Sequence, residues 1–242
     1  MMTGMKSFIA LAAWFVCLSS GFAATENKPL NLVIIGDSTV CNYPTNDVRR
    51  GWGQFIQEYF DKEVKVINLA KSGRSTKTFI KEGLWAKALA AKPDIILIQF
   101  GHNDSHAPTR PEATDAQTDY KTNLCLYIDQ ARAAGAIPIL VTPMVRRTFD
   151  ANGKLEDPLQ RYADAMKEVG KEKSVPVIDL HASSKTLVQS LGETETMKMA
   201  NKPDDHTHFN AAGAQAMAKL VMQELPAVSP VLKSHLKTPQ TD

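Results

Sequence analysis

Residues 31–39 of this 242-residue chain read NLVIIGDST, and this stretch decides the fold. Its apolar run is continuous rather than alternating, which is typical of a strand covered on both faces, as the strands of a parallel sheet are. The run predicts a strand at 31–35, and four later runs share the pattern and indicate further strands at 64–68, 94–100, 137–142 and 175–180. The chain therefore contains five candidate strands of one buried sheet.

Helical patterns fill the intervals between these strands. They cover residues 52–61, 76–90, 119–134 and 158–171, and two more follow the last strand at 182–191 and 210–224. Strands that alternate with helices imply right-handed crossovers and helices on both faces of the sheet. We therefore predict an α/β fold, a three-layer α/β/α sandwich around a five-stranded parallel sheet.

The N-terminal residues have the composition of a secretion signal. Lys6 precedes the apolar run 8–17, and Ala23 ends a small-residue cleavage site for signal peptidase. The run is too short to span a bilayer comfortably. Cys17 suggests lipoprotein processing as an alternative, but the residue before it is not small. We expect a cleaved signal at residues 1–23 and a secreted or periplasmic protein with no membrane anchor.

The mature chain suits one domain and a short tail. Residues 24–225 form the predicted domain, and we expect the proline-bearing residues 226–242 to be loosely docked or disordered. Loss of the signal leaves 27 basic and 26 acidic side chains. The mature chain therefore lacks the excess of positive charge that is typical of nucleic-acid-binding proteins. Cys41 and Cys125 remain, and a disulfide between them stays open because two lone cysteines need not lie close together.

Polar residues follow three of the predicted strands. Ser38 follows the first strand, Gly73 lies shortly after the second, and Asn103 follows the third. In an open α/β sheet the ligand crevice lies beyond the carboxyl ends of the strands. We therefore expect these residues to meet at one edge. A loop that carries Asp205 and His208, between the last strand and the last helix, can reach the same edge.

These five residues have the chemistry of an acyl-transfer site. A serine hydroxyl becomes nucleophilic when a histidine takes its proton, and a carboxylate on the far ring nitrogen fixes the histidine tautomer. The N–H groups of Ser38 and Gly73 and the side-chain amide of Asn103 are candidate donors to an oxyanion. Each residue alone has a structural alternative: Asp205 and His208 can cap the following helix, and Ser38 can cap a turn.

Together, the segments resemble the SGNH or GDSL-like hydrolase family, whose four sequence blocks occur here in order over nearly the whole mature chain. Within that family the sequence of these segments is most similar to that of the rhamnogalacturonan acetylesterases. The matching segments are 36–40 (GDSTV), 68–70 (NLA), 73–75 (GRS), 99–104 (QFGHND), 141–143 (VTP), 205–209 (DHTHF) and 213–214 (GA). The resemblance implies a flavodoxin-like fold, no metal or other cofactor, and removal of acetyl groups from plant cell-wall polysaccharide such as pectin.

The resemblance also implies a role for each site residue. Ser38 matches the nucleophile, and Asp205 and His208 complete the catalytic triad. Ser38, Gly73 and Asn103 match the donors of the oxyanion hole. These roles predict an esterase that works through an acyl-enzyme intermediate.

The expected partner is an acetylated polysaccharide or oligosaccharide, bound by a monomer. Pectic chains carry galacturonate carboxylates, so a matching site should offer cations. Arg74 follows the oxyanion glycine and Arg146 follows the fourth strand, and both are candidate substrate contacts. Asp37 is expected as a turn residue, and His102 as a residue that orients the loop of Asn103.

Three alternatives stay open. Asp205, His206 and His208 can be metal ligands, although this reading leaves Ser38 and the candidate oxyanion donors unexplained. A lipid-directed esterase or thioesterase would use the same triad, but it needs an apolar channel, and the loop 105–118 is polar. A carbohydrate-binding protein without catalysis would keep the fold, yet that reading normally requires a damaged triad.

Overall fold

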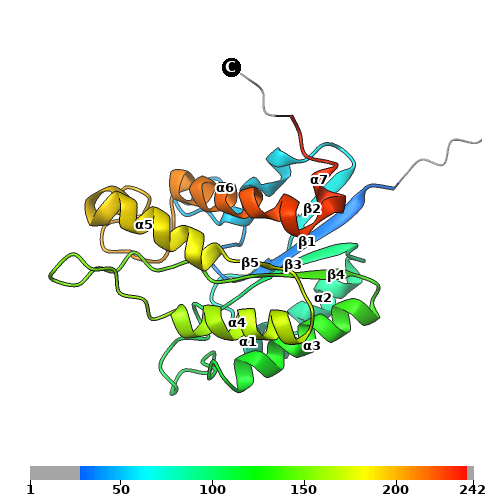
Figure 1. Ribbon diagram of the computed structural model, residues 1–242, viewed down its shortest axis with the longest axis horizontal. Helices are drawn as coiled ribbons and strands as arrows, with labels where there is room; N and C mark the ends of the chain where they lie inside the picture. The colour runs from blue at the N-terminus through cyan, green and yellow to red at the C-terminus, as the bar shows by residue number, and fades with distance from the viewer. Residues whose placement is uncertain (1–27, 239–242) are drawn as a thin grey trace, which may run out of the picture.

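The structure is a computed structural model that describes residues 28–238 (Figure 1). The expected signal at residues 1–23 lies outside the described residues. The five expected strands are present and form one all-parallel sheet in the order β2-β1-β3-β4-β5. Their bounds are β1 Leu30–Gly36, β2 Val64–Asn68, β3 Ile95–Gln99, β4 Ile137–Val141 and β5 Val177–Ile178.

Helices cover both faces of the sheet, which confirms the predicted three-layer sandwich (Figure 1). The lower layer in Figure 1 contains α1 Thr76–Lys81, α2 Leu84–Ala90, α3 Asp119–Ala133 and α4 Gln160–Glu172. The other layer contains η1 Trp52–Tyr59, α5 Leu180–Met197, α6 Ala211–Val228 and α7 Pro230–Lys233.

Strand β1 shows why the apolar runs are continuous. Leu32 and Ile34 face the hydrophobic core that includes residues of α6 and η1. Val33 and Ile35 face the other core, which lies between the sheet and helices α1 to α4. All four side chains are fully buried. Burial of each contributes about 1.5–3 kcal/mol, so a polar residue on either face of this strand would be strongly unfavourable.

Several elements differ from the predicted ranges. Helix α5 continues to Met197 rather than 191, with non-helical backbone at Gly192, whose φ is 72°. The segment 52–61 forms a 3₁₀ helix rather than an α-helix. The expected helix 76–90 is divided at Gly83, whose φ of 71° ends α1 because this left-handed conformation cannot continue a helix. The last strand is shorter than 175–180 because Asp179 already caps α5, where its side chain accepts the N–H of Ala182.

The described part of the expected tail is packed rather than loose, so that expectation is corrected. Helix α6 continues past Pro226, and α7 follows it directly. Leu232 is fully buried in the same core as α6, and Leu236 forms an isolated bridge with Phe60. The apolar contacts of this segment outweigh the missing N–H of the proline, which falls near the end of the helix.

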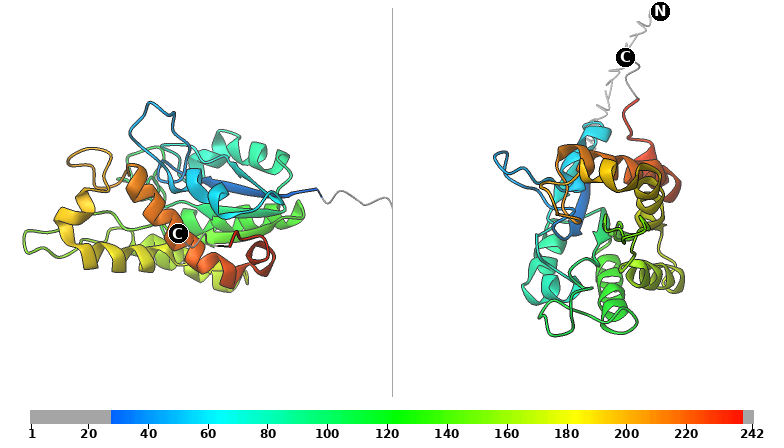
Figure 2. Two further views of the ribbon diagram at one scale, coloured as in Figure 1. Left: turned by 90° about the horizontal axis from the view of Figure 1, so that it is seen from above. Right: turned by 90° about the vertical axis from the view of Figure 1, so that its left-hand side faces the viewer.

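The carboxyl ends of the strands share one end of the molecule, on the left in Figure 1. The chain passes from β1 to β2 on one side of β1 and returns to β3 on the other side, which makes this the topological switch point of the sheet. The loop after β1 meets the loop between α5 and α6 there, and Arg50 N–H donates to the carbonyl oxygen of Phe209 at 2.9 Å (Figure 2).

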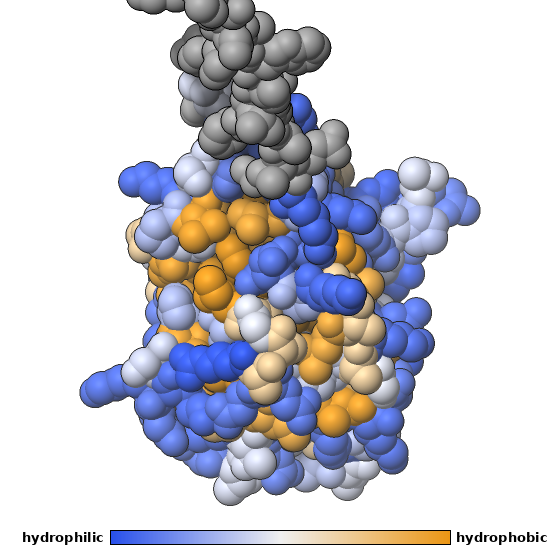
Figure 3. Space-filling view, turned by 90° about the vertical axis from the view of Figure 1, so that its right-hand side faces the viewer, coloured by the Kyte–Doolittle hydropathy of each residue, from blue (hydrophilic) through white to orange (hydrophobic). Residues whose placement is uncertain are grey.

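The opposite end of the molecule carries apolar surface among charged side chains (Figure 3). Ile137 and Val231, in different elements, are 51% and 45% exposed. Single exposed apolar residues of this kind are ordinary for a folded protein. No helix within residues 28–238 is long and apolar enough to cross a membrane.

Candidate active site

Ser38 lies in a tight turn directly after β1. The backbone N–H and the hydroxyl of Thr39 both donate to Asp37 Oδ1 at 2.8 Å, which closes the turn as expected for Asp37. A Cβ added to Gly36 would lie 2.6 Å from the carbonyl oxygen of Gln99, so only glycine permits this approach of β1 to β3. The turn therefore holds Ser38, which is 5% exposed, in a defined position.

Asp205 and His208 converge on Ser38. The Nε2 atom of His208 lies 2.9 Å from Ser38 Oγ, and its Nδ1 atom lies 3.0 Å from Asp205 Oδ2. The other carboxylate oxygen, Oδ1, accepts the N–H groups of Thr207 at 2.9 Å and His208 at 2.8 Å. The helix-cap alternative is wrong, because Asn210 caps α6 through its own side chain. The three residues therefore have the arrangement of a Ser-His-Asp triad.

The environment of Asp205 keeps its carboxylate ionised. Burial alone raises the pKa of Asp205. The N–H groups of His208 and Thr207 and the contact with the His208 ring together lower this pKa by more than burial raises it. The net pKa lies below the ordinary value for aspartate. Asp205 can therefore accept the Nδ1–H of His208 across the neutral pH range.

The candidate oxyanion donors lie on neighbouring loops. The side-chain amide of Asn103 donates to the carbonyl oxygen of Arg74 at 3.0 Å, which fixes the amide plane and leaves its second N–H for another acceptor. Gly73 adopts a φ of 78° in its turn, and a Cβ added there would meet nothing within 4 Å. Within residues 28–238 no hydrogen bond uses the backbone N–H of Ser38 or Gly73. These donors are thus available to a substrate oxygen.

The two predicted substrate cations lie on the site loops and are both engaged. Arg74 pairs with Glu82 at 2.9 Å. Arg146 donates through Nη2 to the carbonyl oxygen of His102 at 3.0 Å and contacts the hydroxyl of Thr207 through Nη1. Burial lowers the pKa of Arg146, although nearby carboxylates oppose this effect. Contact with substrate stays a prediction for both side chains.

A buried pair of side chains connects the nucleophile turn to the oxyanion loop. His102 Nδ1 lies 3.4 Å from Asp37 Oδ2, and both side chains are almost fully buried. Burial lowers the pKa of His102, and Asp37 opposes this. Burial raises the pKa of Asp37, but His102 and Thr39 bring it below its ordinary value. The sequence pattern does not predict this pairing, although Asp37 directly precedes Ser38 and His102 directly precedes Asn103.

A second buried carboxylate, Asp104, joins the two oxyanion loops. Its Oδ1 atom accepts the hydroxyl of Thr76 at 2.6 Å and that of Thr114 at 2.9 Å, and also the N–H of Thr76 at 3.1 Å. Burial raises the pKa of Asp104 to about 7, although these donors lower it. Because Thr76 follows Gly73 closely and Asp104 follows Asn103 directly, this contact ties the positions of both loops together.

Asp104→Asn should remove part of the pH dependence of stability. The folded-state pKa of about 7 exceeds the ordinary 3.8, so between these values the native state holds a proton that the unfolded chain has lost. Wild-type stability therefore falls as the pH rises through this interval. Asparagine can still accept the hydroxyls of Thr76 and Thr114 but cannot ionise. Between pH 5 and pH 8 we expect the Tm of the variant to rise relative to wild type, by about 2–4 °C for each kcal/mol of stability that the wild type loses. Parallel Tm curves in circular dichroism would contradict this.

The metal alternative requires Asp205, His206 and His208 to converge, and they do not. The Nδ1–H of His206 donates to the carbonyl oxygen of Arg147 at 2.7 Å. Asp205 and His208 are bonded to each other instead. Across the described residues, no three His, Cys, Asp or Glu side chains gather as a metal site would require. The disulfide question is also answered, since Cys41 and Cys125 are both free.

Comparison with known sequences identifies a matching family and similar proteins. Residues 34–216 match the GDSL-like lipase/acylhydrolase family. The chain is 40% identical to rhamnogalacturonan acetylesterase RhgT of Bacillus subtilis (strain 168), over 86% of this chain and 95% of that protein. It is 36% identical to the probable rhamnogalacturonan acetylesterase YesY of the same organism, over 86% of this chain and 98% of that protein.

Solved structures share the fold. YxiM from Bacillus subtilis has a TM-score of 0.73 at 31% identity and covers 83% of this chain and 57% of its own. Axe2, an acetylxylan esterase from Geobacillus stearothermophilus, has a TM-score of 0.64 at 19% identity and covers 82% of this chain and 94% of its own. With the family match over residues 34–216 and the RhgT identity, the chain belongs to the GDSL-like lipase/acylhydrolase family and is a carboxylic ester hydrolase of the acetylesterase type.

Proposed function

We propose that the protein is an exported serine esterase that removes acetyl groups from plant cell-wall polysaccharide, with acetylated rhamnogalacturonan as its substrate. The observation that carries the proposal is the unbroken series of contacts from Ser38 Oγ through His208 to Asp205, at 2.9 Å and 3.0 Å. The relatives RhgT and YesY, which are named for rhamnogalacturonan, favour this glycan over the xylan of a 26% identical acetylxylan esterase.

The proposed reaction begins with attack of Ser38 Oγ on the acetyl carbonyl carbon, while His208 Nε2 takes the hydroxyl proton. Asp205 holds the Nδ1–H tautomer of His208 and stabilises the imidazolium that forms. The carbonyl oxygen becomes an oxyanion that accepts the N–H groups of Ser38 and Gly73 and the amide of Asn103. His208 then gives this proton to the sugar oxygen as its bond to the acetyl carbon breaks, and the sugar leaves with a free hydroxyl. A water molecule, deprotonated by the same histidine, cleaves the acetyl-serine and releases acetate.

The surroundings of Ser38 favour a glycan ester over a lipid ester. A long acyl chain needs an apolar channel beside the nucleophile, whereas the side chains that form the nucleophile turn and its contacts are polar, among them Asp37, His102 and His208. A surface groove with apolar lining lies elsewhere, between η1, α6 and the end of the described chain, where Tyr59 and Met222 contribute to it.

Arg74 is the better placed of the two cations to meet a galacturonate carboxylate. Its side chain is 31% exposed and its partner Glu82 is 41% exposed, so solvent and ligand reach the pair. Exchange of one exposed carboxylate for another costs little, since such ion pairs contribute about 0–1 kcal/mol. Arg146 is more buried and would orient the site loops as well as attract an anionic glycan.

Export is supported by the N-terminal sequence. Lys6, the apolar run 8–17 and the small residues before residue 24 fit a cleaved signal. A polymeric cell-wall substrate lies outside the cell that degrades it, so a secreted or periplasmic location suits this substrate. N-terminal sequencing of protein recovered from the medium or the periplasm would test both the cleavage site and the location.

The function is tested by acetate release from acetylated rhamnogalacturonan, acetylated xylan and a long-chain aryl ester, each with and without a chelator. We expect chelator-resistant release that is fastest with rhamnogalacturonan. Faster hydrolysis of the long-chain ester would support the lipid-directed alternative. Binding of the glycans without any acetate release would support the non-catalytic alternative, and chelator-sensitive release would support a metal site.

Asn103→Ala should lower kcat by about two to three orders of magnitude, because it removes one oxyanion donor that acts mainly in the transition state. The KM should change little, since the ground-state carbonyl accepts a weaker hydrogen bond. Steady-state kinetics of acetate release measure both constants. Asn152→Ala on an exposed loop is the control. A kcat within twofold of wild type would exclude the amide of Asn103 from the oxyanion hole.

A further inference from the structure

Arg147 is a fully buried arginine beside the loop that carries Asp205 and His208. It follows β4, and its side chain has no exposed surface. The Nη2 atom donates to the carbonyl oxygen of Asp205 at 2.8 Å and to that of His208 at 2.9 Å. One nitrogen thus bonds to both ends of the four-residue turn in which the carboxylate and the imidazole must meet.

The backbone of Arg147 holds the middle of the same turn. Its N–H donates to the carbonyl oxygen of His206 at 2.9 Å, and its carbonyl oxygen accepts the Nδ1–H of His206 at 2.7 Å. The guanidinium lies over the ring of Phe209, 4.4 Å from the ring centre. Three of the four turn residues and the residue after the turn therefore contact this single arginine.

This arrangement is costly for the fold. Burial lowers the pKa of the Arg147 guanidinium to about 10, and the nearby Asp205 opposes the change, so the group stays charged at neutral pH. Its partners within the described chain are carbonyls and a ring rather than a carboxylate, and its Nε and Nη1 atoms have no partner there. Keeping a charge buried without a carboxylate partner costs free energy that hydrogen bonds to carbonyls only partly offset. Stability alone therefore does not account for Arg147.

The turn needs an external restraint of this kind. The side chain of Asp205 closes the turn on one side through the N–H groups of Thr207 and His208. Apart from Arg147, the carbonyl oxygen of Asp205 has no donor within residues 28–238, and that of His208 accepts only the N–H of Asn201, at 3.3 Å. Peptide planes held this weakly can rotate. A rotation that moves the imidazole by about 1 Å is enough to cost about 100-fold in rate.

We propose that Arg147 is a positioning residue that holds the Asp205–His208 turn in the one conformation in which the imidazole contacts both Ser38 and the carboxylate. This inference rests on the proposed serine mechanism and extends it to a residue that never touches the substrate. Arg147 acts by fixing two backbone carbonyls, so its loss should slow the chemical step and leave glycan binding intact.

The test compares Arg147→Met and Arg147→Lys with wild type. Methionine fills similar space without charge or donors, and lysine restores the charge and one donor group. We expect kcat for acetate release to fall about 10- to 100-fold in Arg147→Met with KM within about twofold, and to recover in part in Arg147→Lys. A second readout needs no glycan: the rate at which a small organophosphate ester modifies Ser38, followed by mass spectrometry, should fall by a similar factor.

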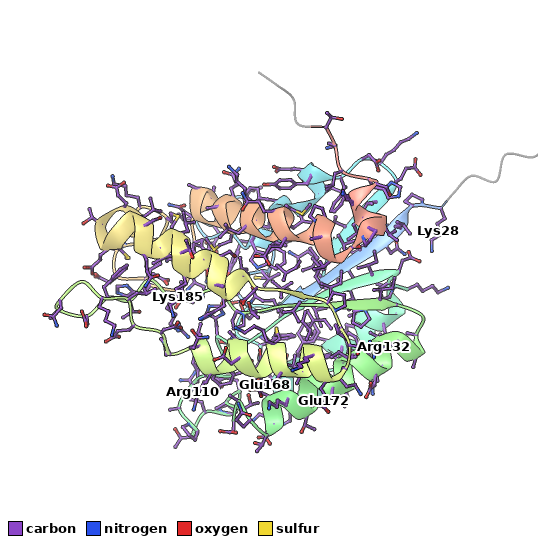
Figure 4. The ribbon with its side chains drawn as sticks, viewed as in Figure 1. Lys28, Arg110, Arg132, Glu168, Glu172 and Lys185 are labelled. Atoms are coloured by element: carbon purple, nitrogen blue, oxygen red, sulfur yellow. The ribbon has the colours of Figure 1, made fainter. Side chains whose placement is uncertain are left out.

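The chain offers a matched control in Arg132. Its Nη2 atom also donates to two successive turn carbonyls, those of Lys173 at 2.8 Å and Ser174 at 3.1 Å. Figure 4 labels it at the end of the molecule opposite to the loops that carry the site. Arg132→Met removes the same kind of contact and should leave both rates within twofold of wild type.

Several results would overturn the proposal. The proposal is wrong if Arg147→Met keeps the wild-type kcat and labelling rate, whatever its Tm. It is also wrong if the substitution changes KM alone. If Arg147→Met does not fold, a folded Arg147→Lys with the wild-type rates has the same meaning. If neither variant gives the wild-type circular dichroism spectrum, Arg147 supports the whole fold rather than the turn, and the proposal is wrong. Because organophosphate labelling does not depend on the natural substrate, an error in the proposed glycan would leave this test valid.

Discussion

Ser38→Ala should lower kcat for acetate release by about four to six orders of magnitude, the largest effect expected of any single substitution in this chain. The change removes the only atom that can form the acyl-enzyme. The His208 ring and the oxyanion donors stay, so a small residual rate above the uncatalysed reaction should remain. The fold should not change, because the turn is closed by Asp37 and Thr39 rather than by the Ser38 hydroxyl. Acetate release and Tm, measured on the same preparation, check both expectations.

Ser190→Ala is the control for this substitution. Ser190 is an exposed serine of α5 whose hydroxyl bonds only to a carbonyl of its own helix, so its loss should leave kcat unchanged. Retention of wild-type kcat in Ser38→Ala would exclude the acyl-enzyme mechanism. If that retained activity were also sensitive to a chelator, a metal-activated water would be the nucleophile in its place.

The fold was predictable because its strands are buried on both faces. The apolar runs identify β1 to β4 within two residues at each end, and they are clearest in β1 and β3, where nearly every side chain lies in one of the two cores. The edge strand β2 carries the exposed Lys65. The errors fall where no such constraint acts. The break at Gly83 depends on a single residue in a left-handed conformation, and the 3₁₀ geometry of η1 has no distinctive periodicity. The packing of the C-terminal segment depends on a few apolar residues, chiefly Leu232 and Leu236, which are too few to form a periodic pattern.

The chemistry of the site was predictable, whereas its supports were not. Ser38 and Asn103 directly follow apolar runs, so the sheet itself brings them to one edge. The residues that hold the site in place are distant in sequence from their partners. Arg147 contacts carbonyls 58 and 61 residues away, and His102, in the loop after β3, contacts Asp37 in the loop after β1. Each is a charged or titratable side chain that burial makes unusual, and burial of a single polar residue leaves no periodic pattern in a sequence.

Asp205→Asn should lower kcat by about four orders of magnitude while the site keeps its geometry. The asparagine oxygen can still accept the N–H groups of Thr207 and His208, which now lie 2.9 Å and 2.8 Å from Oδ1. The NH₂ group then takes the place of Oδ2, where it faces His208 Nδ1. Because two N–H groups repel each other, the ring adopts the tautomer with its proton on Nε2. That nitrogen then donates to Ser38 and cannot take its proton.

The neighbouring Asp204→Asn distinguishes this effect from a general loss of charge near the site. Asp204 is exposed, and its φ of 62° is one that asparagine adopts readily, so the control makes the same chemical change one residue away without strain. We expect wild-type kcat for Asp204→Asn and an unchanged Tm for both variants. A fall of less than tenfold in Asp205→Asn would mean that the 3.0 Å contact holds the loop but does not set the tautomer of His208. Equal losses in the two variants would assign the effect to charge alone, because only Asp205 contacts the ring.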